Sequence, residues 1–334
     1  MVNTFINSAT PSPSPAKTEA KSKTWVASII IPTYNRPERL RNCLSAIVAL
    51  DYPANNFEVI VVDDGSHLPI DPVILSFQDR LNLTVIRQAN AGPATARNAG
   101  IATATGEFVV FIDDDCAPKP DWLRLLVQHL QENRHCLVGG HTLNALPKKL
   151  FSEASQILID YLYQYFNQGF TQATFFASNN FGLSRERIKQ LGGFNTAFPL
   201  AAGEDREFCD RWLQAGYSMQ YVPEARINHY HSLNLKSFWR QHFNYGRGAF
   251  HFHQVRAHRQ DESIKVEPLS FYWNLLIFPL SQGKGWTALP ISLLLLVSQL
   301  ANGLGFFWEM GRARRRSTRQ LPVNSSAQCE AENN

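Results

Sequence analysis

Carboxylates placed directly after apolar runs are the residues in this sequence best suited to chemistry. Three aspartates, Asp113 to Asp115, follow the apolar run Phe108 to Ile112. Asp63 and Asp64 likewise follow the mostly apolar run Phe57 to Val62. Because unpaired carboxylates are costly to bury, such clusters are expected at an opening, where they meet a cation. Hard oxygen ligands of this kind suit Mg²⁺ or Mn²⁺, and a solvated Asp-rich turn is the alternative interpretation.

Apolar runs and amphipathic stretches alternate through the first third of the chain. The apolar runs predict buried strands and the amphipathic stretches predict helices, so the short connections favour a doubly wound α/β sheet. Ligands bind such sheets at the carboxyl ends of the strands, and both acidic clusters are expected side by side at that edge. The expected strands are Val26–Ile31, Phe57–Val62, Leu83–Arg87 and Glu107–Ile112, and the expected helices are Glu38–Leu50, Leu68–Asp79 and Pro93–Ala104.

The pattern beyond Asp115 is more mixed. Periodicity predicts helices and strands without the regular alternation of the first part. The expected helices are Lys119–Asn133, Leu150–Asn167, Ser184–Leu191, Gly203–Ala215 and Leu235 to about His258, and the expected strands are Cys136–Gly140, Thr174–Leu183 and Ala225–Ile227.

Several classes of protein are disfavoured by what the sequence lacks. A dinucleotide-binding domain would show GxGxxG after its first strand, and neither that motif nor a P-loop is present. The five cysteines are scattered without a CxxC pair, which argues against a zinc site or disulfide framework and for a reducing compartment. Trp239 to Gly248 interleaves aromatic and cationic residues as RNA binders do, but no RNA-binding module accompanies it, so no nucleic-acid partner is expected.

Five short motifs occur in an order that resembles one known family. They are Ser28–Arg36, Val61–Ser66, Gly92–Gly100, Phe111–Asp115 and Gly203–Glu207. The sequence is similar to the family 2 glycosyltransferases, which are inverting enzymes of the GT-A fold, over about Val26 to Gly248. The resemblance implies a Rossmann-like, mostly parallel central sheet flanked by helices, with Mg²⁺ or Mn²⁺ as cofactor.

The resemblance implies a nucleotide-sugar pocket at the ends of the first strands. Asp64 would accept a hydrogen bond from a uracil ring, while Pro32 and Tyr34 would frame the base. Arg36, in the same loop as Pro32 and Tyr34, would also bind the nucleotide sugar. Arg97 would reach the nucleotide or its phosphates. A turn role for Asp64 and a surface ion pair for Arg97 are the alternatives from the residues alone.

The resemblance also assigns the metal site. Asp113 would face the ribose, Asp115 would ligate the metal, and Asp114 could share either task. His229 is preferred over His231 as a further group touching the metal or the diphosphate, and a hydrogen-bonded structural histidine is the alternative.

The resemblance also implies that the catalytic base lies at the acidic start of a later helix. The family places its general base at the second acidic residue, which is Asp205, with Glu204 holding the acceptor or structuring the turn. Complementing the helix dipole is the alternative role for this acidic pair. Segments containing Asn179, Asn180 and Gly193 would line the donor-sugar and acceptor pockets.

A charge-free stretch from Trp286 to Trp308 is long enough to cross a bilayer, and Arg312, Arg314, Arg315, Arg316 and Arg319 follow it. Because Leu269 to Leu280 is short for a second span, a hairpin, a re-entrant segment or a monotopic helix is expected, with a buried globular helix as the alternative. The expected segments are a disordered tail (1–24), a GT-A catalytic domain (25–234), a helical linker (235–265), a membrane-associated or transmembrane segment (266–311) and a basic, then polar cytoplasmic tail (312–334).

Together these patterns predict a membrane-associated, metal-dependent, inverting glycosyltransferase with a cytoplasmic catalytic domain at the inner or plasma membrane. The donor would be a UDP-sugar, or else a GDP- or dTDP-sugar, and the acceptor a sugar or lipid-linked hydroxyl in cell-envelope polysaccharide or glycolipid synthesis. Single transfers are expected because the Q-x-x-R-W element of processive synthases is absent. The alternatives are a non-catalytic nucleotide-sugar-binding protein and a sugar-phosphate nucleotidyltransferase, whose Gly-x-Gly-Thr-Arg signature is absent.

Overall fold

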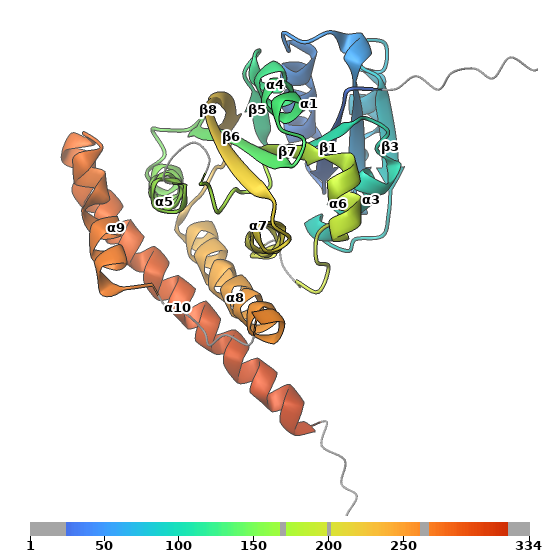
Figure 1. The fold of residues 1–334 in the computed structure, drawn as a ribbon. Coiled ribbons are helices and arrows are strands. Elements are labelled where there is room, and N and C mark those ends of the chain that lie inside the picture. The colour runs from blue at the N-terminus through green and yellow to red at the C-terminus, as the bar shows by residue number, and fades with distance from the viewer. Residues whose placement is uncertain (1–24, 168–171, 199–201, 261–266, 320–334) are drawn as a thin grey trace, which may run out of the picture.

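A mixed β-sheet with helices on both faces forms the body of the protein (Figure 1). The computed structural model describes residues 25–167, 172–198, 202–260 and 267–319, so the predicted tail 1–24 and most of the predicted polar tail lie outside the described residues. Within them the sheet has eight strands in the order β3-β2-β1-β4-β7-β6-β8-β5. The strands are β1 Ala27–Thr33, β2 Phe57–Asp63, β3 Leu83–Arg87, β4 Phe108–Phe111, β5 Cys116–Pro118, β6 Cys136–Asn144, β7 Phe181–Ser184 and β8 Ser218–His229.

The first four strands of this order are parallel, as expected from their strand–helix alternation. β7 runs antiparallel to β4 and β6, β6 pairs parallel with β8, and β5 is antiparallel to β8. The prediction of an α/β, mostly parallel sheet is confirmed. The prediction that the two acidic clusters are neighbours was wrong, because β1 lies between β2 and β4 and Thr33 pairs with Asp63.

Helices cover both faces of the sheet and form two apolar cores. Because successive side chains of a strand point to opposite faces, Ile29 and Ile31 pack into the first core and Ile30 into the second. Gly100 lets α3 approach β1 closely, since a Cβ there would lie 2.4 Å from the Ile30 side chain. The first core involves α1 Pro37–Val48, α2 Asp71–Leu75 and α4 Trp122–Glu132, and the second involves α3 Pro93–Thr103, α6 Arg185–Leu191 and α7 Glu204–Gln214.

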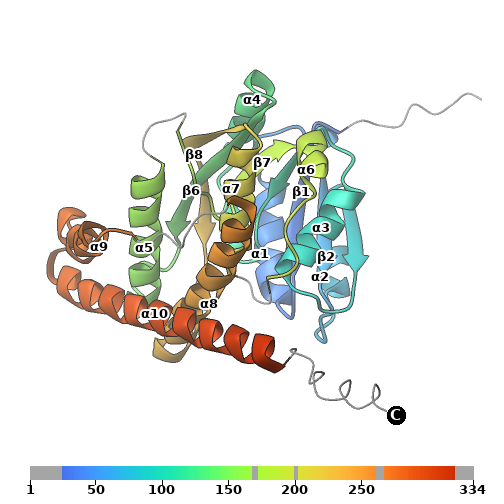
Figure 2. The same cartoon turned by 60° about the horizontal axis from the view of Figure 1, so that its bottom comes forward.

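Three long helices and a short one form the C-terminal part: α5 Leu150–Phe166, α8 Leu235–Gln260, α9 Leu269–Ser281 and α10 Ala288–Arg319. All four contribute to a third apolar core. Of the predicted linker, residues 235–260 form the single helix α8, which contacts both α7 and α10 (Figures 1 and 2), and residues 261–265 lie outside the described residues. Two 3₁₀ turns, Ala54–Asn56 and Gly285–Thr287, precede β2 and α10.

Several predicted element bounds were wrong. α2 covers only Asp71–Leu75, and the strand predicted over 174–183 is confined to β7. β8 is far longer than predicted and β5 was not predicted at all, because neither contains a continuous apolar run. Gly285–Arg315 is the one helix among the described residues that is long and apolar enough to cross a membrane, judged by length and composition alone.

Candidate active site

The three aspartates after β4 differ in the groups that contact them. Asp113 Oδ1 accepts a hydrogen bond from Arg97 Nη2 at 2.9 Å. Asp114 accepts from the Thr33 hydroxyl at 2.8 Å and from Arg36 at 3.2 Å. Burial raises the pKa of Asp114 to about 6, although Arg36 and Thr33 favour its charged form. These consecutive carboxylates therefore lie in different environments.

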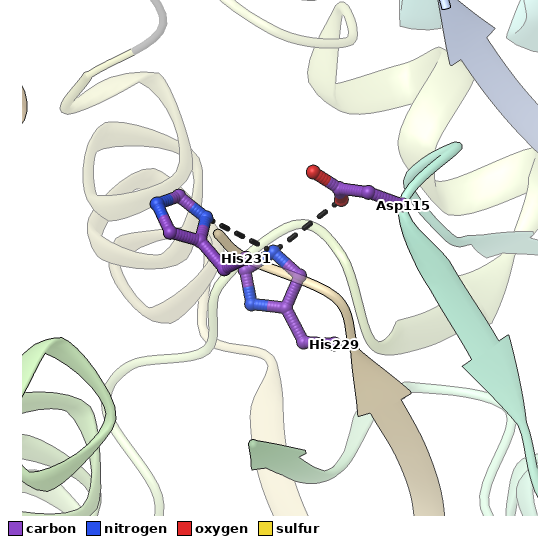
Figure 3. A group of neighbouring side chains, drawn as sticks. All are labelled: Asp115, His229 and His231. Carbon is purple, nitrogen blue, oxygen red and sulfur yellow. Dashed lines mark hydrogen bonds and ion pairs between the residues drawn. The ribbon is translucent and has the colours of Figure 1, made fainter. Parts of the chain in front are cut away.

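Asp115 forms a cluster with His229 and His231, and Figure 3 shows the three side chains converging. The antiparallel pairing of β5 with β8 sets Cys116 opposite His229, which brings Asp115 Oδ1 within 3.3 Å of His229 Nε2. Burial alone would raise the pKa of Asp115, but His229, Arg36 and Arg39 hold it well below its usual range. Asp115 is therefore an ionised carboxylate beside two imidazoles.

The donor set at Asp115, His229 and His231 fits a divalent cation. One potential ligand atom from each residue lies within 4.8 Å of the others. Burial and the neighbouring His229 lower the pKa of His231 to about 4, so its imidazole is neutral. Its Nε2 lies 2.6 Å from the Gln241 oxygen and can only donate there, which leaves the Nδ1 lone pair facing His229 and the cluster. One carboxylate and two imidazoles suit Mn²⁺ better than Mg²⁺, which prefers oxygen ligands.

Arg97 connects this end of β4 to the start of α7. Its side chain is almost completely buried, with Nη1 3.2 Å from Glu204 Oε1 and Nη2 on Asp113. Burial opposes the charge of Arg97, but Asp113 and Glu204 outweigh that effect and raise its pKa. A permanently charged guanidinium thus holds carboxylates from two distant parts of the chain at one site.

At the start of α7, Glu204 is buried and its neighbour Asp205 is half-buried. Burial, followed by the charge of Asp205, raises the pKa of Glu204 to about 7, and burial also raises the pKa of Asp205. Glu204 Oε2 is buried and has no hydrogen-bond partner among the described residues. Carboxylates whose pKa is shifted towards neutrality are suited to proton transfer near physiological pH.

The loop after β1 is tied to the loop after β2 by Asn35, which the sequence reasoning missed. Asn35 has a φ of 56°, a left-handed conformation that Asn tolerates, and its side chain accepts hydrogen bonds from His67 N and Leu68 N. In this loop, Tyr34 is 41% exposed and Pro32 is half-buried in β1. Arg36 is half-exposed and contacts both Asp114 and Asp115.

The Asp64 carboxylate is hydrogen-bonded within the chain. Its carboxylate accepts hydrogen bonds from the backbone N–H groups of Ala91 and Gly92 and from the Gln88 amide. These bonds fix the turn that leads into α3, which is the turn role that the sequence left open. Contact with a nucleotide base stays a prediction.

Comparison with known proteins identifies the family. The sequence profile described as Glycosyl transferase family 2 matches residues 28–192. The chain belongs to glycosyltransferase family 2. A second profile, described as N-terminal domain of galactosyltransferase, matches residues 163–235, which include Glu204 and Asp205.

Curated relatives of this family 2 chain are distant. Glycosyltransferase AglE of Haloferax volcanii is 27% identical over 201 residues, which are 59% of this chain and 64% of AglE. Pre-mycofactocin glycosyltransferase of Mycobacterium tuberculosis is 28% identical over 233 residues, which are 66% of this chain and 46% of that protein. The chain thus matches less than two thirds of the length of either relative.

The fold is shared with a solved structure, the mannosyltransferase PcManGT from Pyrobaculum calidifontis in complex with GDP-Man and Mn²⁺. The two are 21% identical with a TM-score of 0.55, and the match covers 90% of this chain and 82% of PcManGT. At this identity the likeness establishes the GT-A fold of the chain.

Predicted pocket residues of this family 2 chain differ in their surroundings. Asn180 has no exposed surface, and its amide group accepts a hydrogen bond from Trp122 Nε1 at 2.8 Å and donates one to the Ala225 carbonyl at 3.2 Å. Its pocket role stays a prediction. Asn179 is nearly buried beside Thr142. Gly193 has a φ of +72°, and a Cβ there would lie 2.5 Å from the Asn98 amide oxygen. Pocket roles for Asn179 and Gly193 stay predictions.

Helix α8 adds two site residues that the sequence reasoning missed, Gln241 and Tyr245. Gln241 Oε1 accepts from His231, and its amide nitrogen donates to the Tyr245 hydroxyl at 3.0 Å and to Ser155. Burial raises the pKa of Tyr245, and so do the nearby charges of Asp205 and Glu204. A chain of polar contacts therefore runs from Asp115 to Tyr245, whose hydroxyl lies close enough to the acidic pair to be affected by its charge. The spacing of Gln241 and Tyr245 on one helix face was the available signal.

A shallow depression of about 680 Å³ lies elsewhere, at the amino-terminal end of β4. It is lined by residues that include Glu107, Arg134 and Arg185. Arg134 pairs with Glu107, and Arg185 donates to the Gly106 carbonyl. None of the predicted site residues lines it.

Proposed function

We propose that this protein transfers a sugar from a nucleotide-sugar donor to an acceptor hydroxyl, with inversion, in one metal-assisted displacement. The observation that carries the proposal is the bridge made by Arg97. It joins Asp113, where the nucleotide would lie, to Glu204, which precedes the proposed base. Membership of glycosyltransferase family 2 supports the same reaction.

Asp205 is proposed as the general base. It would take the proton from the acceptor hydroxyl while that oxygen attacks the anomeric carbon from the face opposite the nucleoside diphosphate. The bond from the anomeric carbon to the diphosphate then breaks, and its electron pair leaves with the diphosphate. This role requires an ionised Asp205, and burial raises the pKa of Asp205, which strengthens its tendency to accept a proton.

Asp115 and His229, joined by His231, are proposed to hold Mn²⁺ or Mg²⁺. When bound, such an ion would neutralise charge that develops on the diphosphate leaving group. Arg36 and Arg39 lie against Asp115 and are available to contact phosphate oxygens. PcManGT, which shares the fold, was solved with Mn²⁺ and a nucleotide sugar.

The finer proposal is a UDP-sugar donor and an acceptor in envelope polysaccharide or glycolipid synthesis, with GDP- and dTDP-sugars as alternatives. Nucleotide sugars are made in the cytoplasm, so the catalytic domain would lie on the cytoplasmic side of the inner or plasma membrane. The long apolar helix α10 supports membrane association.

The test is a donor screen by nucleotide release, with and without Mn²⁺, using membranes that contain the expressed protein. For the productive donor, Asp205→Asn is expected to lower turnover by about 10²–10⁴-fold while donor affinity changes little. Asp79→Asn, at an exposed site away from the cluster, is the matched control. Full turnover in Asp205→Asn would remove the base assignment, and donor binding without any release would favour a non-catalytic binding protein.

A further inference from the structure

An apolar stripe runs along the outer side of α10. Its members recur every three or four residues, which places them on one face of the helix. Each of them is between 44% and 68% exposed. On α9, Leu269, Trp273, Ile277 and Leu280 form a similar exposed row, and Trp286 between the helices is fully exposed. The α10 stripe consists of Leu289, Leu293, Leu296, Leu300, Leu304, Phe307 and Trp308.

The inner side of α10 is locked to α8. Gly305 permits the contact, because a Cβ there would lie only 1.9 Å from the Phe243 carbonyl oxygen. Glu309 is buried on this side and accepts a hydrogen bond from Arg247 Nε at 2.6 Å. Figure 1 shows α10 running alongside α8, and α10 also contacts α5. One side of α10 is thus packed against protein, while the other presents leucines to the surroundings.

We infer that the α9–α10 hairpin docks in the plane of an anionic lipid bilayer and does not cross it. The inference deepens the membrane association in the proposed function and rests on it. A crossing α10 would have to leave α8, which would strip the buried Glu309 of Arg247. Alternatively, α8 would have to enter the hydrocarbon together with Gln241 and Tyr245. Lying flat preserves both contacts and buries the outer stripe in lipid.

Charge at the end of the stripe identifies the kind of surface. Arg312, Arg314 and Arg315 are exposed and directly follow the apolar residues on the same helix. Cationic residues beside an amphipathic apolar face attract anionic headgroups. Tryptophans at 273, 286 and 308 lie along the hairpin, and this side chain favours the interface between headgroups and acyl chains. A second copy of the chain could cover the leucines, but it would leave this basic end unexplained.

Vesicle flotation tests the docking face. Full-length protein is expected to float with equimolar phosphatidylcholine–phosphatidylglycerol vesicles and weakly with phosphatidylcholine alone. Replacing Leu293, Leu300 and Leu304 together by Gln is expected to reduce flotation at least tenfold. Leu68→Gln with Leu75→Gln is the matched control, because both leucines are exposed on the catalytic domain. Replacing the three exposed arginines by Gln should remove only the preference for phosphatidylglycerol.

Thiol labelling tests the in-plane geometry. Gln282→Cys and Arg314→Cys mark exposed positions near the two ends of α10, in a Cys329→Ser background. In inside-out membrane vesicles, a membrane-impermeant maleimide is expected to label both positions without detergent. Labelling of only one of them before detergent is added would show a crossing helix and overturn the inference.

Failure of docking can be told apart from failure of the proposed function. The leucine-to-glutamine variant is expected to release nucleotide from the productive donor in detergent solution as the wild type does, while losing vesicle binding. Unchanged vesicle binding by this variant would overturn the inference. So would a change confined to oligomeric state, measured by light scattering, because it would show that the stripe binds a second copy.

Discussion

At the scale of single residues, the pKa values of the acidic side chains in this site are shifted in opposite directions. The pKa of Asp115 lies far below its usual range, because His229 and two arginines outweigh its burial. Glu204 is also buried and paired with Arg97, yet its pKa rises to about 7, because burial and then the negative charge of Asp205 outweigh the effect of Arg97. Asp115 thus stays ionised for cation binding while the α7 pair can exchange protons.

The α7 pair is expected to set the acidic limb of the pH profile. Its members titrate together, so kcat/KM should fall as the pH drops through about 7, where the pair gains a proton. Glu204→Gln keeps an oxygen for Arg97 but removes one charge, so the limb should move to lower pH. The measurement is kcat/KM against pH for both proteins, with exposed Glu38→Gln as control. An unmoved limb in Glu204→Gln would show that another group controls it.

Tyr245 is expected to position Gln241, which in turn holds His231 beside Asp115. Tyr245→Phe removes the hydroxyl that accepts from Gln241, a hydrogen bond worth about 0.5–1.5 kcal/mol, or roughly 2- to 12-fold in rate. The loss should appear in kcat, while the KM for the donor stays near the wild-type value. Tyr52→Phe, a partly exposed tyrosine packed on Phe57, is the comparison. Equal kcat values for the two variants would remove Tyr245 from the site.

At the scale of elements, the close contact between α8 and α10 depends on glycines, which have no side chain. A Cβ at Gly246 would lie 1.8 Å from the Asn302 carbonyl oxygen, and one at Gly305 would lie 1.9 Å from that of Phe243. Gly303, which lies on α10 like Gly305, would have nothing within 4 Å of an added Cβ. The two positions of α10 therefore separate the effect of packing from that of helix propensity.

Gly305→Ala is expected to destabilise the protein by about 1–3 kcal/mol, because backbone cannot move aside as a flexible side chain can. Gly303→Ala should be neutral or stabilising by up to about 1 kcal/mol, since alanine favours the helix. Thermal unfolding of both variants in the same detergent gives the comparison. Similar midpoints for the two would mean that the helices do not approach this closely.

Predictability from the sequence followed the strength of local signals. The buried strands β1, β2 and β4 were found because continuous apolar runs mark them. β5 and most of β8 were missed, since three residues or a half-exposed alternating stretch leave no such run. Among site residues, the paired acids stood out at strand and helix ends. Arg39, Gln241 and Tyr245 did not, because only tertiary packing brings α1 and α8 to the cluster.

At the scale of the whole molecule, the site is assembled from distant segments. β4, α3, α7, β8 and α8 each contribute, and ligands that bridge them should stabilise the entire fold. A ligand at one hundred times its Kd adds about 2.7 kcal/mol to stability. The productive nucleotide with Mn²⁺ is therefore expected to raise the unfolding midpoint by several degrees.

Asp115→Asn should abolish the part of this shift that requires Mn²⁺ and leave the smaller shift from nucleotide alone. Chelation with EDTA should reproduce the variant in wild-type protein. Differential scanning fluorimetry with each component alone and together supplies the measurement. A full Mn²⁺-dependent shift in Asp115→Asn would place the cation elsewhere.

Helix α8 presents Gln241 and Tyr245 to the site, while Phe243 and Arg247 on the same helix contact α10. Chimeras should reveal the consequence. Consider a catalytic domain from a relative, with its own α8, joined to this C-terminal hairpin. The side of that α8 that faces α10 would not match this hairpin, so the chimera would lose either its anchorage or its turnover. A junction before Leu235 should preserve the anchorage, because α8 then travels with its hairpin, but turnover should survive only if the relative's site accepts Gln241 and Tyr245.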